Sequence, residues 1–220
     1  MSDKELHDYY GGRAGEYEQI YEKPERQTDL QRVRVWLRAE LTGHRILEIA
    51  CGTGYWTTWL APVAESIVAT DVNPAVLSLA RQKPYPPARV RIEVADAYAL
   101  GGVAGDFTAA FAGFWWSHLP RERQDDFLAS LGVRLGPQAL VVLLDNRFIQ
   151  GSSTPIERQD SSGNTYQRRR LADGREYEVI KNFPSRTDLQ AALRPFARDL
   201  VLTEFEYYWG ARYTTFGADD

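Results

Sequence analysis

The chain has 220 residues, of which 44% are hydrophobic and 25% charged, and its formal net charge is -4. This length and composition predict a single globular domain with a sizeable core, and they exclude a disordered chain or a membrane protein. The acidic balance gives no general attraction for nucleic acid or anionic membranes, so we expect neither as a partner.

Cysteine content and the N-terminal residues indicate the cellular compartment. Cys51 is the only cysteine, so the chain can form no internal disulfide and offers no cluster of thiolates for a metal. The first ten residues, MSDKELHDYY, lack the apolar centre of a signal peptide, and no stretch approaches the roughly 18 apolar residues of a membrane span. We expect a cytoplasmic monomer or homodimer without a metal site.

Residues 1–43 form the first predicted segment, a helical lid. Two short helices separated by a Gly-Gly break would carry several tyrosines. Thr28 and Asp29 can cap a longer helix that runs to about Leu41, with apolar residues at spacings of three and four. This segment is expected to lie on the rest of the domain through the apolar face of that helix.

Residues 44–145 contain strand-like apolar runs that alternate with helical patterns. The runs cover residues 45–49, 66–71, 90–94, 107–114 and 139–145. The middle runs lack a period of two, as expected for parallel strands that helices cover on both faces. This segment therefore predicts a doubly wound α/β sheet.

The pattern changes after this core. Residues 146–184 are polar and rich in turn formers, with a candidate hairpin around Ala172, Asp173 and Gly174. Residues 185–220 predict a helix and then two strand-like runs joined at Gly210, which would supply an antiparallel edge. All these segments are expected to form one domain over residues 1–220.

The stretch EIACGTGYW, residues 48–56, places two glycines between a predicted strand and a predicted helix. Such a turn lets a ligand approach the backbone where helix amides are left to donate. A dinucleotide site would carry a third glycine where this chain has Thr57, and the charge of Glu48 would oppose a phosphate. The loop therefore favours a cationic ligand, although a Gly-x-Gly turn taken alone could be only a tight connection.

Acidic residues also follow the next two predicted strands. Asp71 ends the second strand, where a carboxylate can bind both hydroxyls of a ribose, and Asp96 follows the third strand, within reach of an adenine edge. Each acid alone could be a helix cap or a solvated loop residue. Acids at three successive strand ends, above a glycine turn, indicate a nucleoside-containing ligand.

The segments ILEIACGTG, IVATDVNPAVLSLAR and IEVADAY resemble the successive motifs of class I S-adenosylmethionine-dependent methyltransferases, over about residues 44–145. The resemblance implies a Rossmann-like, mostly parallel seven-stranded sheet of order 3-2-1-4-5-7-6 with an antiparallel C-terminal strand. It implies S-adenosyl-L-methionine as cofactor and S-adenosyl-L-homocysteine as product. The implied cofactor-binding residues are Tyr9, Arg13, Tyr17, Glu48, Ala50, Gly52, Thr53, Gly54, Asp71, Val72, Asn73, Asp96, Ala97 and Phe114.

The same resemblance assigns parts of the cofactor to parts of the sequence. Glu48 and the two glycines would surround the methionine portion, Asp71 would bind the ribose, and Asp96 with Ala97 would contact the adenine. Glu48 would order the loop around the ammonium and sulfonium charges. Cys51, within the loop, is interpreted as a small packing group.

The N-terminal residues Tyr9, Arg13 and Tyr17 resemble an element with which small-molecule methyltransferases close over the cofactor. Arg13 could then meet the cofactor carboxylate. An exposed helix face is the alternative interpretation of the same residues.

The stretch GFWWSHLP, residues 113–120, follows the fourth predicted strand. Because ligands of open α/β sheets lie beyond the carboxyl ends of the strands, Trp115 and Trp116 are candidates for acceptor binding, with ordinary packing as the alternative. His118 could take a proton from a hydroxyl or amine acceptor, or could only cap a helix. A base is not essential, because positioning and desolvation supply much of the catalysis of an in-line displacement.

Two further acceptor-side candidates lie late in the chain. Arg168 is followed by Arg169 and Arg170 in the predicted hairpin, and these arginines either favour an anionic acceptor or simply face water. Tyr208 belongs to an aromatic cluster that could line an aromatic or cationic pocket or could pack in the core.

The sequence thus predicts methyl transfer from S-adenosylmethionine to an oxygen or nitrogen atom of a small molecule. Protein and nucleic-acid acceptors are disfavoured by the acidic balance and by the lack of an NPPY-like motif after the fourth strand. Two alternatives stay open: a non-catalytic S-adenosylmethionine-binding module, and a nicotinamide-dependent oxidoreductase, against which Thr57 and Glu48 argue.

Overall fold

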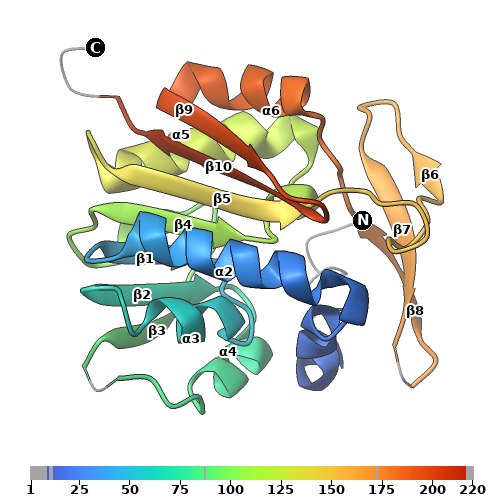
Figure 1. The fold of residues 1–220 in the computed structure, drawn as a ribbon, viewed down its shortest axis with the longest axis horizontal. Coiled ribbons are helices and arrows are strands. Elements are labelled where there is room, and N and C mark those ends of the chain that lie inside the picture. The colour runs from blue at the N-terminus through green and yellow to red at the C-terminus, as the bar shows by residue number, and fades with distance from the viewer. Residues whose placement is uncertain (1–8, 10–11, 87, 172, 217–220) are drawn as a thin grey trace.

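A central sheet with helices on both faces and a smaller, separate sheet make up the fold (Figure 1). The computed structural model describes residues 9, 12–86, 88–171 and 173–216. Most of the first predicted helix therefore lies outside the described residues. Among the described helices, none combines the length and the apolar composition that a membrane crossing needs.

The central sheet confirms the predicted topology. Its strands are β1 (Arg45–Ile49), β2 (Ser66–Asp71), β3 (Val90–Val94), β4 (Ala109–Gly113), β5 (Leu140–Asn146), β9 (Arg198–Glu204) and β10 (Tyr208–Thr214). They lie in the order β3-β2-β1-β4-β5-β10-β9, which is the expected 3-2-1-4-5-7-6 counted within this sheet. The first five strands pair in parallel, while β10 pairs antiparallel with β5 and with β9.

Two apolar cores lie on the two faces of this sheet, because successive strand residues point to opposite sides. Ile46 belongs to one core with helices α2 (Gln27–Leu41), α3 (Tyr55–Leu60) and α4 (Pro74–Ala80). Leu47 belongs to the other core with α5 (Gln124–Leu135) and α6 (Arg186–Leu193). This burial on both faces explains the uninterrupted apolar runs of the central strands.

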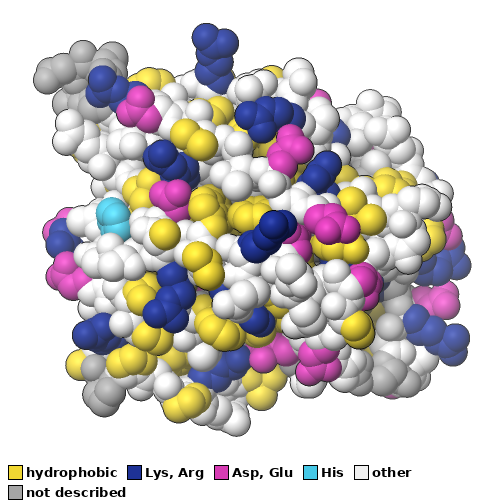
Figure 2. Space-filling model, in the orientation of Figure 1, with side chains coloured by type: hydrophobic (Ala, Val, Ile, Leu, Met, Phe, Trp, Pro, Cys, Tyr) yellow, Lys and Arg dark blue, Asp and Glu magenta, His cyan; other side chains and the backbone are white. Residues whose placement is uncertain are grey.

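Short 3-10 helices connect or extend these elements: η1 (Ala14–Tyr21), η2 (Pro24–Arg26), η3 (Leu100–Gly102), η4 (Trp116–His118), η5 (Arg121–Arg123) and η6 (Arg194–Phe196). The helix α4 has a capped N-terminus, since the Asn73 side chain accepts a hydrogen bond of 3.0 Å from the Ala75 amide and Pro74 occupies the first turn. On the face seen in Figure 2, acidic and basic side chains are interspersed.

The predicted turn at Gly210 is wrong. Residues 205–207 connect β9 to β10, and Gly210 lies inside β10 opposite Leu144 of β5. A Cβ atom on Gly210 would lie only 2.5 Å from the indole of Trp36 on α2. The glycine is therefore explained by the close approach of this helix to the strand, and not by a turn.

The segment 146–184 forms the smaller sheet, beyond the carboxyl ends of β4 and β5 (Figure 1). Its strands are β6 (Arg158–Gln159), β7 (Thr165–Arg170) and β8 (Glu176–Ile180), all antiparallel. The pair β7 and β8 is the hairpin that the sequence predicted. This inserted sheet therefore lies next to the edge where an open α/β sheet binds ligands.

Candidate functional site

The loop between β1 and α3 has an unusual backbone. Its alternate residues Ala50, Gly52 and Gly54 have φ angles of 52°, 55° and 76°. Alanine rarely adopts this region, because its Cβ atom crowds the backbone. A Cβ atom on Gly54 would also lie 2.2 Å from the hydroxyl of Tyr85. The loop thus requires glycine at position 54 for its conformation and for packing.

Glu48 lies beneath this loop on β1 and is 1% exposed. Its carboxylate accepts a hydrogen bond of 2.7 Å from the hydroxyl of Thr57 on α3. Burial raises the pKa of Glu48 to about 8, against the opposing effects of Thr57 and Lys83. The group is therefore mostly protonated at neutral pH, and a cation beside it would favour its ionised form. Thr57 is thus the hydrogen-bond partner of the acid.

Asp71 connects the glycine loop to the end of β2. One carboxylate oxygen accepts from the Gly52 amide at 3.0 Å and the other accepts from the Asn73 amide at 2.9 Å. Val72, between Asp71 and Asn73 in the chain, is 53% exposed and offers an apolar surface. Acid, loop and apolar surface therefore lie at one point of the sheet edge.

Asp96 occupies the corresponding place after β3. It is exposed, and its carboxylate accepts a hydrogen bond of 2.9 Å from the Tyr98 amide. Ala97 beside it is half-buried. Glu48 near the end of β1, Asp71 at the end of β2 and Asp96 after β3 therefore lie on three neighbouring strands or directly after them.

The N-terminal segment reaches the glycine loop through a residue that the sequence analysis missed. Glu18 of η1 accepts a hydrogen bond of 2.7 Å from the buried Thr53 hydroxyl and forms an ion pair of 2.5 Å with Lys83. Arg13 donates to the Tyr9 hydroxyl at 2.8 Å. Tyr17 lies in η1, and its side chain is outside the described part of the chain.

Phe114, directly after β4, is held in a strained conformation among aromatic rings. Its φ angle of 61° is rare for a bulky residue. The ring stacks on Trp56 with centroids 5.9 Å apart and meets Tyr21 and Tyr208 edge-on, at 5.6 and 5.8 Å. These contacts place an aromatic wall between the glycine loop and the inserted sheet.

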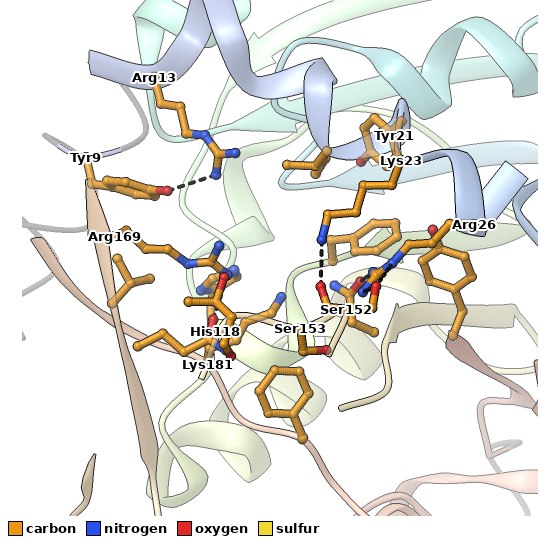
Figure 3. Close-up of a pocket in the computed structure, with 18 residues that line it drawn as sticks. Tyr9, Arg13, Tyr21, Lys23, Arg26, His118, Ser152, Ser153, Arg169 and Lys181 are labelled. Carbon is orange, nitrogen blue, oxygen red and sulfur yellow. Dashed lines mark hydrogen bonds between the residues drawn. The ribbon is translucent and has the colours of Figure 1, made fainter. Parts of the chain in front are cut away.

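A cavity of about 100 Å³ lies on the other side of this wall (Figure 3). Side chains from the N-terminal segment, from β5 and from the inserted sheet converge on it. Its charged lining consists of Arg13, Lys23, Arg26, Arg169 and Lys181, and the described residues place no Asp or Glu in it. We call this space the basic cavity.

Buried polar contacts fix the floor of the basic cavity. Asp145 at the end of β5 is fully buried, pairs with Lys181 at 3.2 Å and accepts from the Ser117 amide at 2.9 Å. Lys181 also donates to the Ser117 hydroxyl at 2.6 Å. The network therefore joins the inserted sheet to the core. Its only signal in the sequence is an acid, Asp145, near the end of an apolar run.

His118 also lines the basic cavity and is buried. Its Nδ1 atom lies 2.8 Å from the Ile180 carbonyl oxygen, which can only accept, so Nδ1 carries a proton. Burial lowers the pKa of His118 well below its ordinary value, and the charges of Lys181 and Arg169 lower it further. The ring is therefore neutral at pH 7, with Nε2 as its acceptor nitrogen.

The two predicted tryptophans lie away from the basic cavity. Trp115 packs against Tyr98 and Phe127, with ring centroids 6.2 and 6.4 Å apart. Trp116 is buried and meets Trp209 edge-on at 6.5 Å. Both indoles belong to the core on the α5 side of the sheet. The surroundings of both tryptophans therefore match the second interpretation of the sequence, which is ordinary packing in the core.

Of the two predicted acceptor residues in the late segments, one lines the basic cavity and the other does not. Tyr208 is buried and lines the basic cavity. Arg168 is exposed and pairs with Glu157 on the outer side of the inserted sheet. Its neighbour Arg169 lines the basic cavity instead, because consecutive residues of a strand point to opposite faces.

Comparisons with known proteins give one family. Residues 46–138 match the sequence model of a family described as "Methyltransferase domain". A structure described as "DhpI-SAM-HEP complex" is 25% identical, with 96% of this chain and 98% of that chain covered and a TM-score of 0.79. SAM-bound CalS10, an amino pentose methyltransferase from Micromonospora echinaspora, is 22% identical over 90% of this chain and 96% of its own, with a TM-score of 0.59. No curated protein sequence matches.

The strand order, the glycine loop and the family match point to the same conclusion. The order of the central sheet is the one that the methyltransferase resemblance implied, and the matched residues contain β1 without Arg45, the glycine loop and β2 to β4. These findings support the interpretation of this chain as a class I S-adenosylmethionine-dependent methyltransferase.

Proposed function

We propose that this enzyme transfers a methyl group from S-adenosylmethionine to an oxygen or nitrogen atom of a small molecule. The observation that carries the proposal is the row of acids Glu48, Asp71 and Asp96 at or near the carboxyl ends of three parallel strands, at the same edge of the sheet as a partly open cavity. When bound, the cofactor would supply a methyl group on a positively charged sulfur; a lone pair of the acceptor would bond to the methyl carbon in line, while the sulfur leaves with the electrons of the broken C–S bond.

The residues at this edge fit such a cofactor chemically. The positive φ angles of the loop leave its backbone open to a ligand, and the buried acid Glu48 beneath it would be stabilised in its ionised form by a cation. We propose that Asp71 binds the ribose hydroxyls, that the exposed side chain of Val72 contacts the adenine ring, and that Asp96 binds its edge.

The N-terminal segment would close this site. Arg13 donates a hydrogen bond to the Tyr9 hydroxyl, and both residues line the basic cavity (Figure 3). We propose that Arg13 binds the cofactor carboxylate and that Tyr9 and Tyr17 cover the cofactor. The contact from Glu18 to the Thr53 hydroxyl would hold the same segment on the glycine loop.

The acceptor would sit in the basic cavity, across the aromatic wall of Phe114 and Tyr208. These rings would exclude water and fix the direction of approach. His118, neutral and with Nε2 as its acceptor nitrogen, would receive the proton of a hydroxyl or amine acceptor. Its lowered pKa makes it a weak base, so we assign most of the rate enhancement to positioning.

The test is a calorimetric titration of the purified protein with S-adenosylmethionine, S-adenosylhomocysteine and NADH. We expect saturable binding of the first two and none of NADH. Asp71→Ala should weaken cofactor binding at least about tenfold, or ~1.4 kcal/mol, because the ribose loses its carboxylate partner. The control is Asp106→Ala, an exposed aspartate that pairs with Arg45 at the opposite end of β1 and should leave binding unchanged.

Binding to neither sulfur compound by a folded protein would refute the proposed cofactor site. Equal weakening by the two aspartate variants would refute the assignment of Asp71. Formation of S-adenosylhomocysteine in the presence of candidate acceptors, followed by identification of the methylated atom, then distinguishes oxygen from nitrogen as the site of transfer.

A further inference from the structure

The basic cavity contains more positive charge than its surroundings neutralise. Lys23 donates to the Ser152 carbonyl at 2.6 Å. The guanidinium of Arg26 donates to the Ser152 hydroxyl at 3.0 and 2.9 Å and to the Asn146 side-chain oxygen at 3.2 Å. Arg26 is only 7% exposed, although all these partners are uncharged. A buried guanidinium of this kind is costly unless an anion accompanies it.

Arg169 adds a third positive charge from the inserted sheet. Its side chain is half-buried and donates at 2.5 Å to the amide oxygen of Gln167. Figure 3 shows Arg169 on one side of the basic cavity and Lys23 with Arg26 on the other. Within the described part of the chain, none of these three cations forms an ion pair.

Two carboxylates lie close to this network without forming an ion pair with Lys23, Arg26 or Arg169. Asp145 is paired with Lys181, and Glu25 is exposed and accepts from the Ser152 hydroxyl at 2.8 Å. The positive charges also act on one another. Burial is the largest cause that lowers the pKa of Lys23. The charges of Arg26 and Arg169 lower this pKa further, and the charge of Glu25 opposes them.

We propose that the methyl acceptor carries an oxyanion, either a carboxylate or a phosphoryl group, which Lys23, Arg26 and Arg169 bind in the basic cavity. The inference rests on the proposed function and names the substrate class of the same site. Two guanidinium groups and an ammonium match the several oxygens of such a group, and the mutual repulsion of the cations falls when it binds. The cavity of about 100 Å³ suits a small anionic group.

The position of the cations also determines where the acceptor would be held. The basic cavity is lined by Phe114 and Tyr208 as well as by the three cations, so an oxyanion bound there keeps the acceptor beside the aromatic wall. Arg169 comes from β7 and Lys23 from the loop before η2. Segments outside the central sheet would thus select the acceptor, while the strand ends bind the cofactor.

The experiment uses calorimetry on the full-length protein saturated with S-adenosylhomocysteine. The probes are inorganic phosphate, acetate and trimethyl phosphate, the last being an uncharged ester of phosphate. We expect at least one anion to bind and the ester not to bind. Arg169→Gln should weaken the anion about tenfold or more, because it removes one of three charges. Arg168→Gln, the neighbouring arginine on the outer face, should change the affinity less than about twofold.

The two anions distinguish the sources of the oxyanion, since binding of phosphate alone assigns a phosphoryl acceptor and binding of acetate alone assigns a carboxylate. Lys23→Gln provides a second variant if Arg169→Gln fails to fold. If S-adenosylhomocysteine binds and neither anion does, the inference is overturned and the proposed function stands. Equal weakening by Arg169→Gln and Arg168→Gln would also overturn it. A protein that does not bind S-adenosylhomocysteine refutes the proposed function itself.

Discussion

The two halves of the carboxyl edge of the central sheet carry different ionisable groups, acids in one half and bases in the other. Glu48 lies near the end of β1, Asp71 ends β2 and Asp96 follows β3, whereas the basic cavity lies beyond β4 and β5. The acids are held by hydrogen bonds from hydroxyls and backbone amides, whereas three of the cations have only uncharged partners among the described residues. One edge is therefore suited to a cation and its neighbour to an anion.

The difference also follows the origin of the residues in the chain. The acids come from strand ends of the methyltransferase core, where the parallel sheet dictates their positions. The cations come mainly from the N-terminal segment and the inserted sheet, which pack against that core. The charge of the acceptor side can thus vary without disturbing the cofactor side.

The largest effect is expected from breaking the anchor of the basic half. Lys181→Met leaves the fully buried Asp145 without its counter-ion, and the free energy of unfolding should fall by about 3 to 5 kcal/mol. Urea unfolding followed by circular dichroism measures this loss. Lys23→Met is the control, because Lys23 is half-buried and contacts only a carbonyl oxygen, so it should lose much less.

A loss below about 1 kcal/mol in Lys181→Met would mean that the pair with Asp145 does not hold the inserted sheet on the core. The double variant Lys181→Met with Asp145→Asn removes both charges. It should recover part of the lost stability, because no uncompensated charge then stays buried.

A second prediction concerns the acidic half and its dependence on pH. In the absence of cofactor, the pKa of Glu48 is about 8 in the folded protein, against an ordinary value near 4.5. The folded state therefore binds more protons than the unfolded state between these values, and this group makes stability fall as pH rises from 4.5 to 8. Glu48→Gln resembles the protonated acid and removes that dependence.

Thermal unfolding of both proteins at pH 5 and pH 8 measures this effect. We expect Glu48→Gln to gain stability relative to the wild type on going to pH 8, by an amount on the order of a few kcal/mol. A difference between the proteins that does not change with pH would contradict the raised pKa. The same substitution should also weaken binding of the cationic cofactor. Glu48 would then affect both the pH dependence of stability and cofactor binding.

The two halves also differ in how far their sequence predicts them. The parallel strands, their order and the acids at their ends follow from apolar runs and a glycine turn, because strand ends of a doubly wound sheet lie at one edge. The acceptor side depends on tertiary contacts. Arg168 and Arg169 differ only by the face of β7 on which they lie, and the sequence does not determine that face in a polar strand.

Close packing explains the other failures. Gly210 resembled a turn residue, but its role depends on Trp36, which approaches from a helix more than 150 residues earlier in the chain. The ion pair of Asp145 with Lys181 likewise joins residues from β5 and the end of the inserted sheet. No local pattern contains either contact, so only the folded arrangement reveals them.

The smallest effect provides the most direct measurement of charge in the basic half. His118 should stay neutral through the usual titration range, because burial and the charges of Lys181 and Arg169 lower its pKa. Proton NMR of the imidazole signals, assigned with His118→Asn, follows this titration. Arg169→Gln removes one of the charges and should raise the pKa of His118 only in part, because burial is the larger cause, whereas Arg168→Gln should leave it unchanged. An ordinary pKa for His118 in the wild type would mean that the basic cavity is solvated. Water would then stabilise the three cations, and they would not require a bound anion.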